Sequence, residues 1–506
     1  MIKSDSIIIL GGGSAGWMTA ATLINRYPHK DITVIESPNT PTVGVGESTL
    51  GQINVWMQLL GIKDEDFMPH TDASYKLSIK FTDFYEKGKS FHYPFGLPLE
   101  SNLTLNKQNW FYKKYGSDSY IDNSDYANFL HPNMALVNNK TMTMNENNEI
   151  PGFCPIHHVA YHFDATKFGL WLRENYCKPR GVKHIVEDIT DIQSDENGIT
   201  SLNGHSADLY FDCTGFRSLL MNELNVPFNS YEDLLPNNKA WATRVPYSNK
   251  KEQLEPYTDC TALGNGWVWN IPSWERIGTG YVYSDKYTTD EDALKEFKEH
   301  LSNKGLDYSN SDFKNISMRV GLHDDIFVKN VCAIGLSAGF IEPLESNGLL
   351  SVHVFMLALL NVMDRDDGNL SSFDISAFNN YCKDFFQAFA DFVACHYAFS
   401  KRVDTEYWKD ISNRKWLEFA KHESMKLNMQ VGMVRDEFYN SGFGINHIAT
   451  GMNWHTFSPI HLSNMNHDVE KIKQENSHRD NLVKKWNNIA KMCKPMIERL
   501  KEIHGK

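Results

Sequence analysis

Apolar and polar positions form three blocks over the first forty residues, and these blocks predict a compact β-α-β unit. Residues 6–10 form an apolar run typical of a buried strand, residues 14–26 show a helical period, and residues 31–36 predict a second strand. The first run ends in three glycines and lacks the small-residue cleavage site of a signal peptide. A strand, a glycine turn and a helix in this order are typical of one half of a nucleotide-binding fold.

The middle of the chain, up to about residue 160, is rich in aromatic residues and mixes the strand and helix periods. Its asparagine-rich stretch, 123–148, favours loops and insertions. Asp164 is the expected N-cap of a helix over 165–177. Residues 184–189 and 208–215 predict strands, and the second reads as a central strand that runs into a glycine turn.

The remainder of the chain contains an all-strand stretch and then mostly helices. Residues 238–284 alternate β-branched and aromatic residues, which predicts an antiparallel sheet. A further buried strand is expected at 331–335 and a helix from about 348 to 362. From residue 371 onwards the pattern is mostly helical, with a loop-rich interruption at 439–463.

This order of elements predicts a mixed α/β fold in two parts. The first, residues 1–370, is a nucleotide-binding core with an inserted antiparallel sheet, and the second, residues 371–506, is a mostly helical region packed on that core. A chain of 506 residues that is 41% hydrophobic can bury a core of this size.

Composition excludes several kinds of partner. A formal net charge of −13 argues against nucleic acid or an anionic membrane as the main partner. No apolar run reaches the roughly 18 residues that a membrane-spanning helix needs. Eight cysteines without a C-x-x-C pair favour reduced thiols in a cytoplasmic protein, and the twenty histidines show no metal-ligand spacing. We therefore expect no metal, and leave open whether the chain forms a homo-oligomer.

A G-x-G-x-x-G motif lies between the first strand and the first helix. Gly11 permits the tight turn, Gly13 lets the backbone approach a pyrophosphate, and Gly16 allows close packing of helix on strand. The helix start at Ser14 and Ala15 supplies amide donors and partial positive charge.

Two further features of the sequence bear on which dinucleotide the chain binds. Glu36 follows about 20 residues after the motif, at a strand end where an acid binds ribose hydroxyls. FAD is favoured over NAD because the strand at 331–335 and the segment 345–350 fit the late return of an FAD-binding fold to the flavin. The glycine-rich segment 42–49 either covers the flavin ring or simply turns the chain.

Three other features have both a structural and a chemical reading. If Lys76 lies on a strand, it shares one face with Lys80, and two solvated lysines on an edge strand are the favoured interpretation. Glu345 either caps a helix start or acts as a base beside main-chain amides that bind an anion. Trp267 and Trp269 share one face of a strand, as core or as the wall of an aromatic site.

Together these segments resemble the flavin-dependent halogenases of the tryptophan halogenase family. The resemblance covers about residues 5–410 and rests on six segments: the glycine loop with Trp17, 41–47, 73–76, 266–272, 278–284 and 342–346. It implies an FAD-binding, Rossmann-like flavin-monooxygenase fold. It also implies that a separate flavin reductase supplies reduced FAD, and that dioxygen and a bound halide then yield hypohalous acid. This oxidant reaches a small aromatic substrate through a tunnel, which restrains side reactions in water.

The resemblance also implies roles for individual residues. Lys76 hydrogen-bonds or captures the oxidant, and Glu345 orients it or takes the ring proton. The amides of Asn347 and Gly348 contact the halide. Further expected contacts are Gly46, Val186, Leu336 and Leu349 for the cofactor, Tyr93, Phe95 and Trp454 for the substrate, and Trp267, Trp269 and Ser346 as the barrier between flavin and substrate.

Three departures from the family pattern bear on specificity. Asn347 stands where tryptophan halogenases carry threonine, Tyr93 aligns with a substrate-stacking histidine, and no Tyr-Tyr pair occurs near 443–447. We therefore predict an electron-rich indole or phenol other than free tryptophan, with bromide or iodide favoured over chloride. The competing hypotheses are a flavin-dependent aromatic hydroxylase and a non-catalytic FAD protein.

Overall fold

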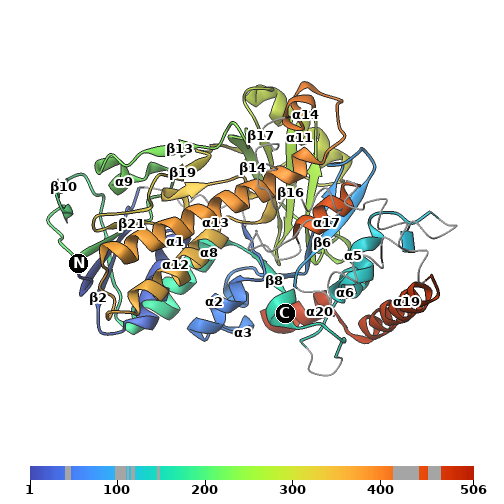
Figure 1. The fold of residues 1–506 in the computed structure, drawn as a ribbon, viewed down its shortest axis with the longest axis horizontal. Coiled ribbons are helices and arrows are strands. Elements are labelled where there is room, and N and C mark those ends of the chain that lie inside the picture. Colours follow the sequence, from blue (N-terminus) through green and yellow to red (C-terminus); the bar gives the residue numbers. More distant parts are fainter. Residues whose placement is uncertain are drawn as a thin grey trace. The chain divides into compact units, whose positions relative to one another are not determined.

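The chain folds into two compact units, each assembled from three segments. The computed structural model describes residues 1–39, 47–96, 110, 113–114, 120–144, 149–413, 444–453 and 469–505 (Figure 1). The first unit comprises Met1–Ala73, His162–Ala242 and Lys314–Gln387, and the second comprises Ser74–Tyr161, Thr243–Phe313 and Ala388–Lys506. The division expected at residues 370 and 371 coincides with no boundary between these units and stays a prediction.

A six-stranded sheet forms the centre of the first unit, in the order β20-β21-β12-β1-β2-β9. The strands from β21 to β9 are parallel, and β20 pairs antiparallel with β21. β1 lies inside the sheet and is almost entirely buried, as its uninterrupted apolar run predicts. The bounds are β1 Ser6–Leu10, β2 Asp31–Glu36, β9 Lys183–Val186, β12 Leu209–Asp212, β20 Phe327–Val328 and β21 Val331–Ala333.

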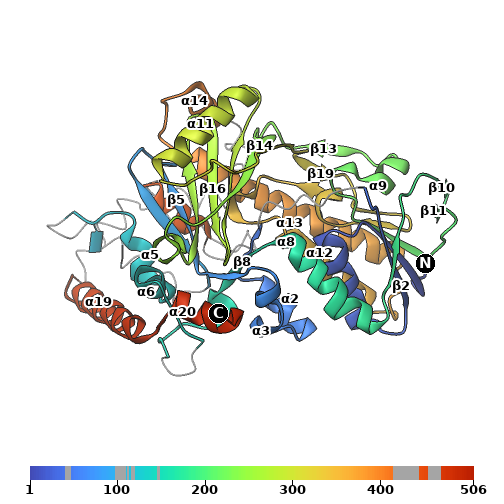
Figure 2. The same cartoon turned by 180° about the vertical axis from the view of Figure 1, so that it is seen from behind.

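The first helix of this unit follows β1 directly and packs against two helices from distant segments. α1 (Ser14–Arg26) contacts α8 (Ala165–Trp171) and α12 (Leu350–Met363), and the three run side by side in Figures 1 and 2. Asp164 caps α8 by accepting a hydrogen bond of 3.1 Å from the Lys167 amide, which confirms the predicted N-cap.

Smaller elements complete the first unit. They are the helices α2 (Ile53–Leu60), α3 (Asp64–Phe67) and α9 (Leu219–Glu223), the π-helix η2 (Leu172–Cys177), and the strands β3 (Glu47–Ser48), β10 (Ile192–Asp195), β11 (Gly198–Leu202), β13 (Phe228–Ser230), β18 (Lys314–Ser317), β19 (Gly321–His323) and β22 (Gly339–Phe340). β14 (Lys239–Val245) and β8 (Ala160–Phe163) each cross a boundary between the units.

An antiparallel meander joined to two earlier strands forms the sheet of the second unit. β16 (Gly266–Pro272) pairs antiparallel with both β15 (Tyr257–Ala262) and β17 (Ile277–Tyr283), as the sequence predicts. β5 (Ser78–Thr82) pairs parallel with β15 and antiparallel with β6 (Ser90–Pro94). β5 is therefore an inner strand, and the edge strand expected for Lys80 is wrong, whereas Lys76 ends β4 (Ser74–Lys76), an edge strand of the three-stranded sheet β3-β8-β4. α11 (Asp290–Asn303) packs on β17 (Figure 2).

Two stretches predicted as loops contain helices. The asparagine-rich region forms α5 (Asp125–Leu130) and α6 (Asn133–Asn139) before the short strand β7 (Thr141–Met142). Apolar side chains override the asparagines there, since Tyr126, Phe129 and Leu130 cluster with Trp110 in a buried core. The interruption predicted at 439–463 contains α17 (Gly444–Gly451), and its other residues lie mostly outside the described ranges.

The C-terminal part of the chain is mostly helical where it is described. Besides α17, its helices are α13 (Ser372–Ala398), α14 (Glu406–Ile411), α19 (Val469–Met492) and α20 (Met496–His504), with the short strand β23 (Lys494–Pro495). In the portion of the chain covered by the structure, no helix combines the length and the apolar character needed to cross a bilayer. Within the same portion, no three His, Cys, Asp or Glu side chains are grouped to hold a metal.

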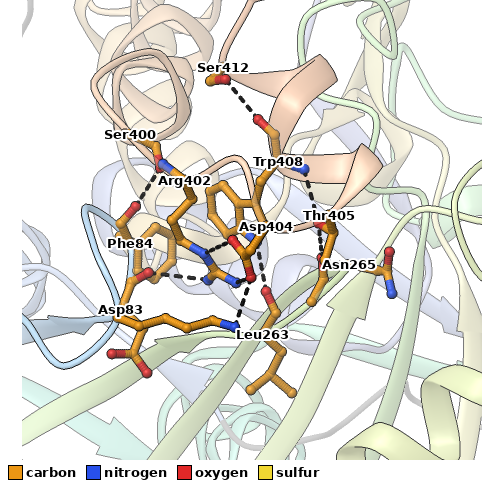
Figure 3. A network of polar contacts seen from close by, with 12 residues as sticks. Asp83, Phe84, Leu263, Asn265, Ser400, Arg402, Asp404, Thr405, Trp408 and Ser412 are labelled. Carbon is orange, nitrogen blue, oxygen red and sulfur yellow. Dashed lines mark hydrogen bonds and ion pairs between the residues drawn. The ribbon is translucent and has the colours of Figure 1, made fainter.

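A buried arginine holds the segment that joins α13 to α14 in the second unit. Arg402 donates two hydrogen bonds of 2.9 Å to the Asp404 carboxylate and one of 3.2 Å to the Asp83 carbonyl (Figure 3). Its guanidinium lies 4.4 Å from the ring centroid of Trp408, whose Nε1 donates to the Leu263 carbonyl. The hydrogen bonds from Arg402 hold the pKa of Asp404 well below its usual range. This network connects the segment to the β5–β6 turn and to the β15–β16 hairpin.

Candidate active-site residues

The glycine loop of the first unit has the geometry of a pyrophosphate cradle. Gly11 has a φ of 118°, and a Cβ on it would overlap the carbonyl oxygen of Cys213 at the end of β12. A Cβ on Gly16 would overlap the Gly11 carbonyl oxygen. Within the described chain no side chain caps α1 at Gly13, so the first helix amides remain available to a phosphate. The residues present therefore fit the diphosphate of a dinucleotide.

The late strand returns to this loop, as expected for an FAD-binding fold. β21 lies beside β12, and the chain then turns at Gly335, whose φ is 70°. A Cβ on Gly335 would come within 2.9 Å of the Ala15 side chain. The expected cofactor contact Leu336 follows directly in the turn Gly335–Ser337. Ser14 is buried and donates its hydroxyl to the Ala165 carbonyl at 2.7 Å, which joins the loop to α8.

Two expected contacts for the adenosine end lie on neighbouring strand ends. Glu36 is the last residue of β2 and pairs in register with Val186, the last residue of β9. The Val186 residue is 58% exposed at the end of β9, the edge strand of the six-stranded sheet. The Glu36 carboxylate suits the hydroxyls of a ribose, and the exposed Val186 side chain suits the flat face of a base.

The segment around Glu345 is a tight turn that precedes a helix. Glu345 is fully buried and ends the 3₁₀ turn Pro343–Glu345, and Ser346 follows with a φ of 58°. α12 begins only at Leu350, with no acidic residue in its first turn. The helix-capping interpretation of Glu345 is therefore wrong for α12. Glu342 instead accepts a hydrogen bond of 2.6 Å from the Asn237 amide.

The two amides expected to contact a halide follow this turn. Within the described chain, neither the Asn347 amide nor the Gly348 amide donates a backbone hydrogen bond. The Asn347 side chain is turned back, because its Nδ2 donates to the Ile341 carbonyl at 3.3 Å. Two adjacent main-chain donors without an acceptor suit a small anion. Leu349, an expected cofactor contact, is the N-cap of α12.

A buried serine pair joins the Ser346 turn to the second glycine-rich segment. The hydroxyl of Ser346 lies 3.1 Å from that of Ser48, and both residues are buried. Sequence reasoning did not single out Ser48, although it lies in the glycine-rich segment 42–49, for which covering the flavin ring is one of two interpretations. Gly46, in the same segment, lies outside the described residues.

Lys76 lies at the end of β4 (Ser74–Lys76) in the second unit and is fully buried. The solvated-lysine interpretation is therefore wrong. Its Nζ is 4.8 Å from the ring centroid of Phe95, close enough for a cation–π interaction. Asn133, which the sequence did not indicate, donates to the carbonyls of Leu77 and Phe95 at 2.8 and 3.2 Å. This buried amide ties the residue after Lys76 to the ring beside its ammonium group.

The expected substrate-side residues Tyr93 and Phe95 belong to an aromatic cluster of the second unit, in which Phe95 is buried and Tyr93 partly buried. The ring centroid of Tyr93 lies 6.2 Å from that of Phe95 and 5.7 Å from that of His447. His447 also contacts Tyr126 and His131, at 5.1 and 4.7 Å between centroids. Sequence reasoning missed His447, because α17 was predicted as a loop. Trp454 lies outside the described residues.

A neutral histidine supports the strand that carries Tyr93. Burial, together with the positive charge of Lys80, lowers the pKa of His92 to about 3. His92 Nδ1 lies 3.0 Å from the Ser78 hydroxyl on the neighbouring strand. The imidazole is thus uncharged at neutral pH and cross-links β5 to β6.

The prediction that the two tryptophans lie on the same face of one strand is confirmed. Trp267 and Trp269 lie on β16 with ring centroids 6.1 Å apart, and both are buried. The hydroxyl of Ser74, two residues before Lys76, donates to the Pro272 carbonyl at the end of that strand, at 2.5 Å. The second unit therefore holds Lys76, the tryptophan pair and the substrate-side rings, whereas the first unit holds the glycine loop, Glu36 and the Glu345–Gly348 turn.

Comparisons with known proteins identify close relatives. A sequence model described as tryptophan halogenase matches residues 6–458. The 7-chloro-L-tryptophan 6-halogenase of Kutzneria sp. (strain 744) is 34% identical over 440 residues, which cover 81% of this chain and 82% of that protein. The apo structure of VirX1 is 36% identical, with a TM-score of 0.88 over 99% of both chains. Tar14, a tryptophan C-6 flavin-dependent halogenase (chlorinase) from taromycin biosynthesis, is 27% identical, with a TM-score of 0.84 over 100% of both chains.

Proposed function

Because the chain belongs to the tryptophan halogenase family, we propose that it halogenates an electron-rich indole or phenol through hypohalous acid. The protein is a flavin-dependent halogenase, and this class of enzyme uses FAD, a halide and dioxygen. In this proposal a separate flavin reductase supplies the FAD in its reduced form. Bound reduced FAD supplies the two-electron chemistry with dioxygen that turns the halide into an electrophile.

The observation that carries the proposal is the pair of adjacent amides at Asn347 and Gly348, which have no backbone acceptor within the described chain. They follow directly on the fully buried Glu345, in the unit that also holds the glycine loop. A halide bound there would accept both amide hydrogens, and the backbone turn would keep them oriented before any reaction.

Cofactor binding in this proposal is distributed over the first unit. The helix amides at Ser14 and Ala15 receive the diphosphate, and Glu36 accepts from the ribose hydroxyls. Leu336 follows the turn at Gly335 that approaches Ala15. Val186 offers its exposed side chain to the adenine.

Lys76 and Glu345 handle the oxidant and the proton. The Lys76 ammonium donates a hydrogen bond to hypohalous acid or captures its halogen, and burial keeps bulk water away from this step. Glu345, as a carboxylate, stabilises the cationic ring and accepts the proton that leaves the halogenated carbon. Tyr93 and Phe95 contact the aromatic substrate in this proposal.

Replacing Glu345 with glutamine is expected to lower kcat for halogenation at least about 100-fold, because an amide neither accepts the ring proton nor balances the cationic ring. FAD affinity is expected to stay unchanged. Product formation by liquid chromatography and FAD binding by fluorescence quenching check both parts. The exposed Glu223→Gln is the matched control and should leave both values unchanged. Wild-type turnover in Glu345→Gln would remove Glu345 from the proposed chemistry.

A substrate and halide panel tests the function as a whole. The purified protein is combined with a generic flavin reductase, free tryptophan, other indoles or phenols, and chloride, bromide or iodide. Mass spectrometry is expected to show halogenated indole or phenol, with more product from bromide or iodide than from chloride. Tryptophan belongs in the panel because the Kutzneria relative acts on a chlorotryptophan. Clean chlorination of free tryptophan alone would overturn the specificity proposal, and a hydroxylated product alone would establish the aromatic hydroxylase.

A further inference from the structure

Two basic side chains of the first unit converge on one oxygen of the Glu36 carboxylate. His184 Nε2 lies 3.0 Å from Glu36 Oε2, and Arg173 Nη1 lies 3.5 Å from the same oxygen. The other oxygen, Oε1, has no hydrogen bond within the described part of the chain. The Glu36 side chain is 27% exposed, so a ligand can reach it.

Strand register places His184 next to Glu36. Val34 of β2 lies opposite His184 of β9, and Glu36 lies opposite Val186. Residues paired in register share a face of the sheet, and so do residues two apart on one strand. The His184 ring is therefore on the face that carries both Glu36 and the apolar Val186.

The imidazole itself is held from the helix side. The fully buried Trp17 of α1 meets the His184 ring edge to face, with centroids 5.2 Å apart. Only 11% of the His184 side chain is exposed. A ring fixed between helix and strand gives its Nε2 a defined direction, and this direction is toward Oε2.

We propose that His184, with Arg173, is a positioning residue for FAD: it holds Oε2 of Glu36 so that Oε1 accepts from the adenosine ribose. The inference rests on the FAD site proposed above and adds a residue that the glycine motif does not contain. An unrestrained glutamate side chain loses rotamer entropy when it binds a ligand, and a carboxylate held in advance by a charge-assisted hydrogen bond loses less.

An alternative role for His184 and Arg173, in which they compete with FAD for the Glu36 carboxylate, predicts a change in FAD affinity of the opposite sign. If His184 and Arg173 merely occupied the carboxylate in the absence of ligand, FAD would have to displace them. Removal of His184 would then strengthen FAD binding. The sign of the change in affinity therefore separates positioning from competition.

The test measures the dissociation constant of oxidised FAD by quenching of flavin fluorescence on the full-length protein. His184→Ala is expected to weaken FAD binding about tenfold, equivalent to losing one oriented charge-assisted hydrogen bond. His184→Gln should recover most of this loss, because its amide Nε2 also donates toward Glu36, and a merely structural role would show no such recovery.

Lys183→Ala is the matched control. Lys183 precedes His184 on the same strand, points to the opposite face, and pairs with Asp31 at 2.7 Å. Its removal should leave FAD affinity unchanged. Thermal melting of each protein without flavin shows whether a variant is folded, so that a loss of affinity can be assigned to the site.

Glu36→Gln distinguishes failure of the inference from failure of the proposed FAD site. If Glu36→Gln weakens FAD binding and His184→Ala does not, the positioning role is refuted and the ribose contact stands. If Glu36→Gln leaves the affinity unchanged, the proposed ribose contact itself is refuted. In the double variant, His184→Ala is expected to add little to Glu36→Gln, since both act through one carboxylate. Additive losses would also overturn the proposal.

Discussion

Replacing Lys76 with alanine is expected to lower aromatic halogenation by about 10³-fold or more while reduced FAD and dioxygen are still consumed. The lysine is fully buried, and its ammonium lies 4.8 Å from the Phe95 ring. Lys76 is the donor in the proposed step, whereas the residues proposed to bind FAD lie in the other unit. Product by mass spectrometry and oxygen consumption by electrode measure the two rates separately.

Lys80→Ala is the control for Lys76→Ala. Lys80 follows four residues later, on β5, is only partly buried, and has its Nζ 5.8 Å from the Tyr257 ring. Its removal should leave the yield of halogenated product per FAD close to that of the wild type. If Lys76→Ala still forms halogenated product, the proposed role of the lysine is refuted. If the variant loses oxygen consumption together with product, Lys76 is needed for a step before hypohalous acid forms.

Replacing Gly16 with alanine is expected to abolish measurable FAD binding, with an affinity loss of at least about 100-fold, or roughly 2.7 kcal/mol. The new Cβ would overlap the Gly11 carbonyl, so α1 has to move away from the loop. The amides at Ser14 and Ala15 then no longer meet the diphosphate. Overpacking of this kind costs a further ~1–3 kcal/mol of folding stability. Flavin fluorescence quenching and thermal melting measure the two effects.

Gly61→Ala separates the two effects in that experiment. Gly61 ends α2 with a φ of 69°, and an added Cβ meets no atom within 4 Å. Alanine there costs about 1–2 kcal/mol from the left-handed backbone alone and should leave FAD binding unchanged. FAD affinity retained in Gly16→Ala would contradict a cofactor role for the glycine loop.

Features encoded within a few residues were predictable from the sequence. The bounds of β1, α1 and β2 agree with the prediction because an apolar run, a glycine turn and a helical period are local signals. Asp164 was recognisable as a cap for the same reason. The shared face of Trp267 and Trp269 follows from the two-residue period of any strand.

Features that depend on distant segments were not predictable in this way. The surroundings of Lys76 are decided by later segments of the chain, because the Phe95 ring lies beside its ammonium group and Asn133 donates to the Leu77 and Phe95 carbonyls. The two interpretations of Glu345 could not be separated from the sequence, because the pattern does not show that Glu345 ends a 3₁₀ turn and that α12 begins only at Leu350. His184 had a local signal, two residues before the expected contact Val186, but its partner Glu36 belongs to another strand.

The sequence by itself determined the nucleotide-binding start of the chain, the candidate residues and, through their resemblance to a family, the class of chemistry. Only the tertiary structure decided which of those residues are buried, which amides are left without a backbone acceptor, and which side chains hold Glu36. The physical reason is that propensity, capping and periodicity act over one to four residues, whereas burial and hydrogen-bond partners depend on strand pairs and helix contacts formed by segments far apart in the chain.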